Sequence, residues 1–208
     1  MELSKSQFGQ DVHIIENVYS NKKNGFFLEI GAYDGINMSN TYLLEHKYNW
    51  TGVCVECNPI WFSKLKINRP NCINLDFAVY NEDNKVLEFI NDDTGGCSGF
   101  VETNTHGHIL KKEIIKVKTQ KLTTILETVN APNFIEFLSL DTEGSEYEIL
   151  NSHNFDKYIF GYICVEHNFI SSNRIKIRNL LESKGYLFYR ENSVDDDYIH
   201  SSICDINR

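Results

Sequence analysis

The sequence predicts a three-layer α/β fold, in which helices cover both faces of a mostly parallel sheet. Short apolar runs alternate along the chain with stretches of helical periodicity, which is typical of strand-helix-strand units. These runs are apolar almost throughout, as expected for strands that are buried on both faces. The length of 208 residues suits a single domain over 1–208, and no internal repeat or Pro/Gly-rich linker divides the chain.

The first half of the chain contains three predicted strands and two predicted helices. We expect strands at 25–31, 51–56 and 72–78, and helices at 38–48 and 59–68. Ser39 or Asn40 can cap the first helix, because both side chains accept hydrogen bonds from backbone amides. Pro59 suits the first turn of the second helix.

The second half continues the alternation after a less regular middle segment. Strand patterns at 86–90 and 114–119 flank a loop rich in Gly, Ser and Asn. Further strands are expected at 134–140, 158–165, 187–189 and 198–203, with helices over 122–129, 145–150 and 174–184. Gly185 is a suitable residue to end the last helix.

The acidic composition limits the partners of this protein. Asp and Glu outnumber Lys and Arg by 29 to 20, and the formal net charge is -9. This balance argues against nucleic acid, which is bound through clustered basic residues, and suits a cationic small molecule. No apolar run approaches the length of a membrane helix, and the first ten residues are polar, so we expect neither membrane insertion nor a secretory signal. We therefore predict a cytoplasmic protein with reduced cysteines; the sequence does not indicate its oligomeric state.

The turn after the first strand is the main candidate binding feature. In a parallel sheet, ligands bind where the strands end, and Gly31 and Gly35 allow a tight turn and a close backbone approach there. Tyr33 occupies the second glycine position of the dinucleotide fingerprint, and no phosphate-binding loop follows, so a pyrophosphate is disfavoured. Glu56 ends the second strand, where a carboxylate can accept both ribose hydroxyls. A nucleoside without pyrophosphate, such as S-adenosylmethionine (SAM), fits this pattern.

Further polar residues follow the later strands. Asp76 and Phe77 would contact the adenine, through the exocyclic amine and an apolar face. Asp141 and Glu143 follow the fourth strand, and His167 follows the fifth. Any of these last three can take a proton from a hydroxyl acceptor.

We interpret two other groups of polar residues as structural and not as part of the site. His106 and His108 are read as part of an exposed polar loop, the alternative being a lid over the site. The three consecutive aspartates at 195–197 are expected in a solvated turn. Successive residues of an extended chain point to opposite faces, so the three cannot share one ion.

Several motifs together resemble those of the FkbM-type methyltransferases. They are SQFGQD (6–11), FLEIGAYDG (27–35), SNT (39–41), LLE (43–45), WTGVCVE (50–56), NP (58–59), NR (68–69) and LDTEGSEY (140–147). The resemblance extends over most of the chain, and the combination is more specific than any single glycine motif.

The resemblance implies a class I methyltransferase fold, with a seven-stranded sheet of order 3-2-1-4-5-7-6 and an antiparallel seventh strand. It implies methyl transfer from SAM, with S-adenosylhomocysteine (SAH) as product, to a hydroxyl of a sugar, glycan or glycosylated natural product, a deoxyhexose being plausible. The residues it assigns to SAM are Glu29, Gly31, Asp34, Gly35 and Glu56, with Gln10, Asp11 and Asn40 closing the methionine end. We expect Ala32, in the same turn, to bind SAM with them. It places Asp141 to Glu143 at the methyl group.

Alternatives remain for the chemistry and the context. A divalent metal held by Asp141, Glu166 and Asn168 would lower the pKa of the acceptor hydroxyl, although a reaction without metal is favoured. A SAM-fold binding protein without catalysis is the other alternative. Because family members occur in the glycan systems of large viruses, the chain can also be a module of a larger polypeptide, or act in a host cytoplasm.

Overall fold

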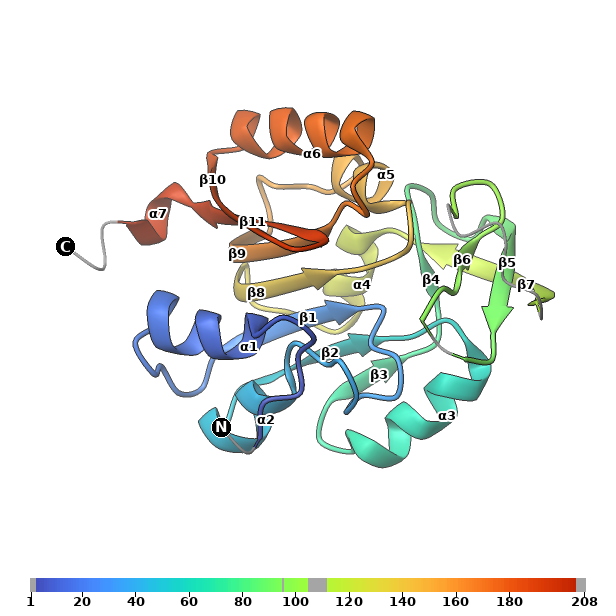
Figure 1. The fold of residues 1–208 in the computed structure, drawn as a ribbon, viewed down its shortest axis with the longest axis horizontal. Coiled ribbons are helices and arrows are strands. Elements are labelled where there is room, and N and C mark those ends of the chain that lie inside the picture. Colours follow the sequence, from blue (N-terminus) through green and yellow to red (C-terminus); the bar gives the residue numbers. More distant parts are fainter. Residues whose placement is uncertain (1–2, 95, 105–111, 205–208) are drawn as a thin grey trace.

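The computed structural model describes residues 3–94, 96–104 and 112–204, and it confirms the three-layer α/β prediction (Figure 1). The central sheet has the order β10-β11-β9-β8-β1-β2-β3. Its strands are β1 (Phe26–Ile30), β2 (Thr51–Val55), β3 (Ile73–Leu75), β8 (Phe134–Leu140), β9 (Ile159–Glu166), β10 (Tyr186–Asn192) and β11 (Asp195–His200). Numbered within this sheet alone, the order is the expected 3-2-1-4-5-7-6, and β11 is antiparallel to both neighbours.

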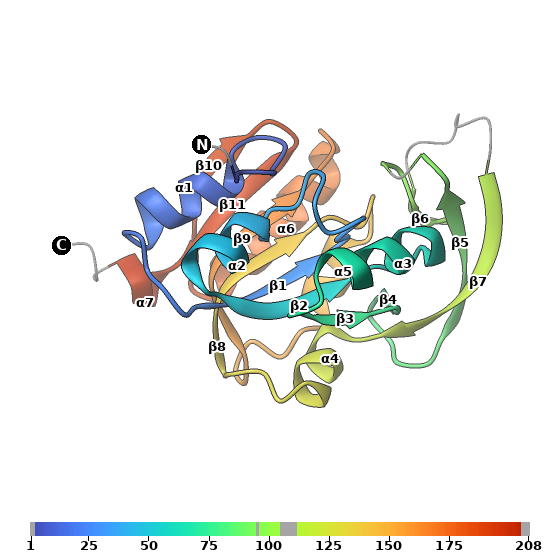
Figure 2. The same cartoon turned by 90° about the horizontal axis from the view of Figure 1, so that it is seen from below.

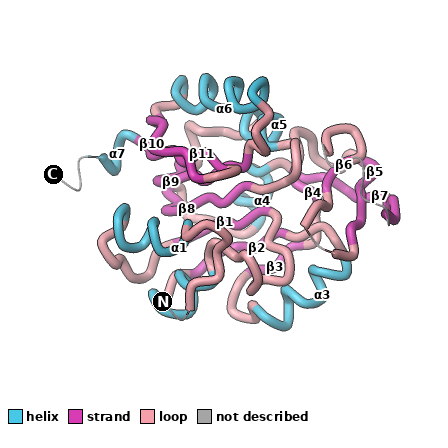
Figure 3. The backbone as a smooth tube through the Cα atoms, in the orientation of Figure 1, coloured by secondary structure: helices cyan, strands magenta, loops and turns pink. Residues whose placement is uncertain are grey.

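Helices cover both faces of this sheet (Figures 1 and 3). One face packs against α1 (Gln10–His13), the π-helix η1 (Ile14–Val18), α2 (Tyr42–Tyr48) and α3 (Pro59–Asn68). The other face packs against α4 (Leu122–Thr128), α5 (Glu146–Asn151) and α6 (Ser171–Ser183). A short helix, α7 (Ser201–Cys204), follows β11. Neighbouring residues of one strand enter opposite layers: Phe27 lies in the first core and Leu28 in the second.

A second, smaller sheet lies beyond the carboxyl ends of the central strands, at the opposite end of the molecule from α7 (Figure 2). Its order is β4-β7-β5-β6. The strands are β4 (Ala78–Val79), β5 (Val86–Asp92), β6 (Gly99–Phe100) and β7 (Lys112–Gln120). The sequence predicted β5 and β7, but β4 and β6 are too short to show a strand period. The predicted third strand at 72–78 is divided, because β3 ends at Leu75 and β4 joins the small sheet.

Two helix predictions need correction at their starts. The first predicted helix begins at Tyr42 instead of residue 38, because the preceding segment is bound to the sheet by its side chains. Ser39 Oγ accepts the Tyr42 amide at 3.1 Å and also donates to the buried Glu29. The helix expected at 174–184 begins earlier, at Ser171, and Gly185 follows its end with φ of 87°. The helical segment 10–18 was not predicted.

The aspartates at 195–197 are buried in β11, so the predicted solvated turn is wrong. As expected, successive aspartate side chains point to opposite faces of the sheet. Asp196 pairs with Arg174 at 2.6 Å, while Asp197 accepts from Arg190 and from the Tyr162 hydroxyl. Buried carboxylates are tolerated when such partners compensate the lost hydration. These partners lie far away in the sequence or on other strands, where a local pattern does not reveal them. Within the described ranges, no helix is long and apolar enough to cross a membrane.

Candidate active site

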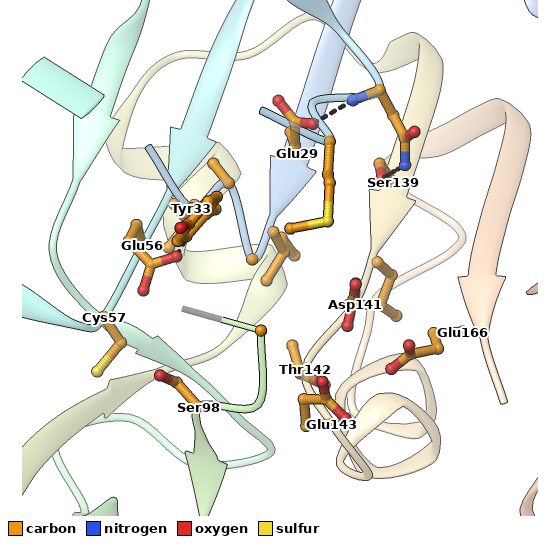
Figure 4. Close-up of a pocket in the computed structure, with 18 of the residues that line it drawn as sticks. Glu29, Tyr33, Glu56, Cys57, Ser98, Ser139, Asp141, Thr142, Glu143 and Glu166 are labelled. Atoms are coloured by element: carbon orange, nitrogen blue, oxygen red, sulfur yellow. Dashed lines mark hydrogen bonds between the residues drawn. The ribbon is translucent and has the colours of Figure 1, made fainter. Parts of the chain in front are cut away.

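A pocket of about 340 Å³ lies at the carboxyl ends of the central strands and extends to the small sheet (Figure 4). Its described lining includes six carboxylates, and it includes no Lys, Arg or His. The carboxylates are Glu29, Glu56, Asp141, Glu143, Glu166 and Asp195. Glu56 lies on one side of the pocket. Asp141, Glu143 and Glu166 lie on the opposite side and face one another (Figure 4).

The turn after β1 brings the backbone close to the tip of β8. Gly31 has φ of 81°, and a Cβ on it would lie 2.1 Å from the carbonyl oxygen of Asp141, so no other residue fits. The amides of Gly31 and Ala32 both donate to the carbonyl of Val55, and both residues line the pocket. The turn therefore joins the tips of β1, β2 and β8 into one wall.

Asp34 and Gly35 shape this turn from outside the pocket. Asp34 accepts the amides of Ile36 and Asn37 at 2.9 and 2.8 Å, which builds the turn that follows. Gly35 also has φ of 81°, and a Cβ on it would clash with α3. Neither residue lines the pocket. Their predicted contact with SAM is therefore not supported by their position.

Glu29 lies at the floor of the pocket with its carboxylate already engaged. It accepts Ser39 Oγ at 3.0 Å, the Asn40 amide at 2.7 Å and Thr41 Oγ1 at 2.6 Å. The fully buried guanidinium of Arg69 lies 3.6 Å away. Glu29 thus holds the 39–41 segment in place, and that segment presents Asn40 to the pocket.

Glu56 is the carboxylate on the nucleoside side of the pocket. Its oxygens accept the Tyr33 amide at 2.8 Å and the Asn58 amide at 2.7 Å, and the Cys57 amide also interacts with the group, which orients it in the pocket. Burial raises the pKa of Glu56 to about 7, and these amides oppose the shift. The side chain is thus positioned to accept a diol.

The wall near Glu56 contains residues that sequence reasoning missed. Phe89 and Phe100 of the small sheet line the pocket beside the predicted Phe77. Asp76 is exposed and lies outside the lining, so its predicted contact with adenine is not supported. No local signal identifies Phe89 or Phe100, because only the packing of the small sheet brings them here.

The opposite wall is a cluster of three acids from the tips of β8 and β9. Oxygens of Asp141, Glu143 and Glu166 lie within 4.8 Å of one another. Asn168 donates its side-chain amide to Glu143 at 3.0 Å and to Glu166 at 2.8 Å. Burial, followed by repulsion from Glu146, raises the pKa of Glu143 to about 7. For Asp141, which keeps exposed surface in the pocket, partial loss of hydration and then repulsion from Glu143 raise the pKa to about 8. Burial and then Asp141 raise the pKa of Glu166 as well.

His167 does not join this cluster, so its predicted role as base is not supported by its position. Glu166 and Asn168 line the pocket and His167 does not: the step from Glu166, at the end of β9, to His167 reverses the direction of the side chain, and Asn168 follows in a turn with φ of 46°. His167 Nδ1 accepts the Phe169 amide, and Nε2 lies 3.7 Å from Asp196. Burial lowers the pKa of His167. His106 and His108 lie outside the described residues.

The N-terminal segment reaches the same pocket. Gln10 lines it and donates to Asp195 at 2.8 Å, which joins the two ends of the chain beside the acid cluster. Asp11 is fully buried outside the lining, where it accepts the hydroxyls of Ser4 and Ser6. Gln10 is therefore placed to contact a ligand, and Asp11 secures the segment. The sequence did not single out Asp195 as a pocket residue.

The raised pKa values predict that stability falls as the pH rises from about 4.3 to 8. A carboxyl group with a raised pKa keeps its proton in the folded state after the unfolded chain has released it, so the free energy of unfolding decreases across this window. Urea unfolding of the parent and of Glu143→Gln between pH 5 and 8 tests this prediction. We expect the variant to lose about 1–2 kcal/mol less than the parent. Parallel curves would contradict it.

Solved structures of methyltransferases resemble this chain in fold. The methyltransferase domain of METTL16 has a TM-score of 0.50 at 11% identity, covering 90% of this chain and 64% of that chain. Precorrin-6y C5,15-methyltransferase from Geobacter metallireducens has 0.48 at 14%, covering 96% and 89%. M. capricolum TrmK in complex with SAH has 0.47 at 13%, covering 94% and 68%. No curated protein matches the chain.

The strand order is that of the class I methyltransferase fold, and the pocket lies at the strand ends, where ligands bind in such sheets. The family model of the methyltransferase FkbM domain matches residues 29–188, which is most of the chain. The protein therefore belongs to the FkbM methyltransferase family.

Proposed function

We propose that this protein transfers the methyl group of SAM to a hydroxyl group of a sugar or glycan, such as a deoxyhexose, or of a glycosylated natural product. The observation that carries the proposal is the acid cluster of Asp141, Glu143 and Glu166, which shares one pocket with Glu56. Glu56 is suited to the nucleoside of the cofactor, and the cluster is suited to a hydroxyl that must lose its proton. We also propose a cytoplasmic location, where the cysteines would stay reduced.

The chemistry of the pocket fits SAM. Gly31, Ala32 and Glu56 would hold its nucleoside, and Gln10 and Asn40 line the pocket in positions that suit the methionine end. The surplus of carboxylates attracts a cation, whereas a pyrophosphate would find no described Lys or Arg in the lining. When bound, SAM supplies an electrophilic methyl group on a sulfonium.

The residues of the chain supply proton transfer and positioning. Asp141 has accessible surface within the pocket, and its raised pKa suits a base that works near neutral pH. Glu166, with the largest upward shift among the three, retains a proton beside it. Asn168 holds Glu143 and Glu166 at the edge of the cluster. The proton of the acceptor hydroxyl would pass to Asp141 as the hydroxyl oxygen takes the methyl group, the methyl–sulfur bond of SAM breaks and SAH leaves.

The lining also favours an acceptor without negative charge. A phosphorylated sugar or a nucleic acid would find no described basic side chain among the six acids of the lining to pair with its phosphate. A neutral glycoside needs no such partner, and its apolar ring face can pack on an aromatic side chain of the pocket.

A divalent metal is a second candidate for how the cluster acts. The three acids offer hard oxygen ligands close together, which suits Mg²⁺ or Ca²⁺. The predicted ligand set was Asp141, Glu166 and Asn168. The side-chain nitrogen of Asn168 donates to the carboxylates and cannot bind a metal, so Glu143 takes its place in the set. The metal would lower the pKa of the acceptor hydroxyl.

Formation of SAH tests both versions. We expect the protein to convert SAM to SAH with neutral glycosides of fucose or rhamnose, to give no SAH with the corresponding sugar phosphates, and to keep its rate in EDTA. Mass spectrometry of both products measures the outcome and locates the methyl group. Methylation of nitrogen or carbon would contradict the proposal. A rate that disappears in EDTA and returns with Mg²⁺ would establish the metal version.

A further inference from the structure

The small sheet contacts the loop that carries Glu143 at two glycines. A Cβ on Gly99, in β6, would lie 2.9 Å from Asn104 Nδ2 within the same sheet, 3.1 Å from Glu143 Cβ and 3.3 Å from the carbonyl oxygen of Thr142. A Cβ on Gly144 would lie 2.4 Å from the carbonyl oxygen of Thr103. Residues 99–104 and 142–144 therefore lie in close contact: a side chain on Gly144 would clash with the backbone of Thr103, and a side chain on Gly99 would displace its neighbours by a few tenths of an ångström.

The segment 99–104, which we call the β6 turn, is held firmly in the small sheet. The amides of Thr103 and Asn104 both donate to the carbonyl of Phe100, and the Asn104 side chain donates to the carbonyl of Cys97 at 2.9 Å. The ring of Phe100 is buried and packs edge-on against Tyr80. The β6 turn thus offers a fixed surface to the residues that it touches.

Glu143 is held between this surface and the acid cluster. Its φ is 58°, in the left-handed region that glutamate seldom adopts, so its backbone depends on surrounding contacts. Gly99 lies against its Cβ, and Asn168 donates to its carboxylate. These contacts direct the carboxylate toward Asp141 and Glu166.

We propose that Gly99 is a positioning residue for Glu143, and that the β6 turn thereby sets the geometry of the acid cluster in the methyl-transfer site. This inference rests on the proposed function of the cluster, but it assigns a separate role to the small sheet. The small sheet would then set the position of the Glu143 side chain and also form part of the pocket wall.

Gly99→Ala tests the proposal, with Val101→Ala as the control, because Val101 is an exposed residue of the same β6 turn and lies outside the pocket lining. Gly99 does not have a positive φ, so alanine suits its backbone. The main readout is the titration of the Glu143 carboxyl carbon by NMR, assigned with Glu143→Gln. We expect Gly99→Ala to shift the midpoint by about half a pH unit, because displacement changes the burial of the carboxylate, its repulsion from Glu146 and its hydrogen bond from Asn168. Val101→Ala should titrate like the parent.

Two further measurements separate positioning from general damage. SAH affinity by calorimetry should stay within about twofold of the parent, while SAH formation with the best glycoside falls about tenfold. A lower melting temperature with an unchanged Glu143 midpoint would overturn the proposal, and so would equal midpoints in both alanine variants. A parent that binds SAH but methylates no glycoside would contradict the proposed acceptor instead, while the NMR comparison would still decide the role of Gly99.

Discussion

Replacing Asp141 with asparagine is expected to reduce methyl transfer about a thousandfold, which is the usual loss when a general base is removed. Affinity for SAH should stay within about twofold, because asparagine preserves the shape of the side chain. The carbonyl of Asp141 that touches Gly31 belongs to the backbone and is unchanged. SAH formation with the best neutral glycoside and calorimetry with SAH measure the two quantities at pH 8, where the parent carboxyl is substantially ionised.

Asp156→Asn is a suitable control, because Asp156 is exposed and lies outside the pocket. It should match the parent in both measurements. If Asp141→Asn retained more than about a tenth of the parent rate, another group would be the base, and Glu143→Gln would be the next variant to compare. A matching loss of SAH affinity would instead indicate that Asp141 holds the cofactor.

Replacing Glu56 with glutamine is expected to weaken SAM and SAH binding about a hundredfold. The change removes a charged acceptor from the diol, and hydrogen bonds to charged groups contribute about 1.5–3 kcal/mol each. It also removes a negative charge opposite the sulfonium, so SAM should lose more affinity than SAH. Calorimetry with both compounds at pH 8 measures this difference, because Glu56 has a pKa of about 7 and is mostly ionised there.

Glu88→Gln provides the matched control, since Glu88 is an exposed residue of the small sheet. A circular dichroism melt should show that both variants fold. Equal affinity of the parent and Glu56→Gln for SAH would mean that the carboxylate serves only the amides of Tyr33 and Asn58. The nucleoside would then need another acceptor.

Local sequence patterns were sufficient for most of the central fold. Both faces of the inner strands are covered, so β1, β2, β8 and β9 are apolar runs whose limits differ from the predicted ones by one residue at most. The bounds of α3 are as expected, because Pro59 and the capping Asn58 mark its start. The match to the FkbM domain confirms the family that the combined motifs indicated.

The site could be predicted only in part. Motif spacing brought Gly31, Glu56 and Asp141 to one edge, because the carboxyl ends of parallel strands meet there. It did not separate Glu166 from His167, since one step along an extended chain reverses the direction of a side chain. Their burial against different partners decides which of them faces the pocket.

The order of residues along the chain was therefore enough to establish the layered sheet, the family and the edge at which the ligand site lies. These properties follow from local hydrophobic periodicity and from short motifs. Packing between distant segments decided the rest: Asp195 lies beside Gln10, the β6 turn lies against Glu143, and the aspartates of β11 pair with arginines. Such contacts depend on the geometry of the whole fold, which neighbouring residues in the sequence do not specify.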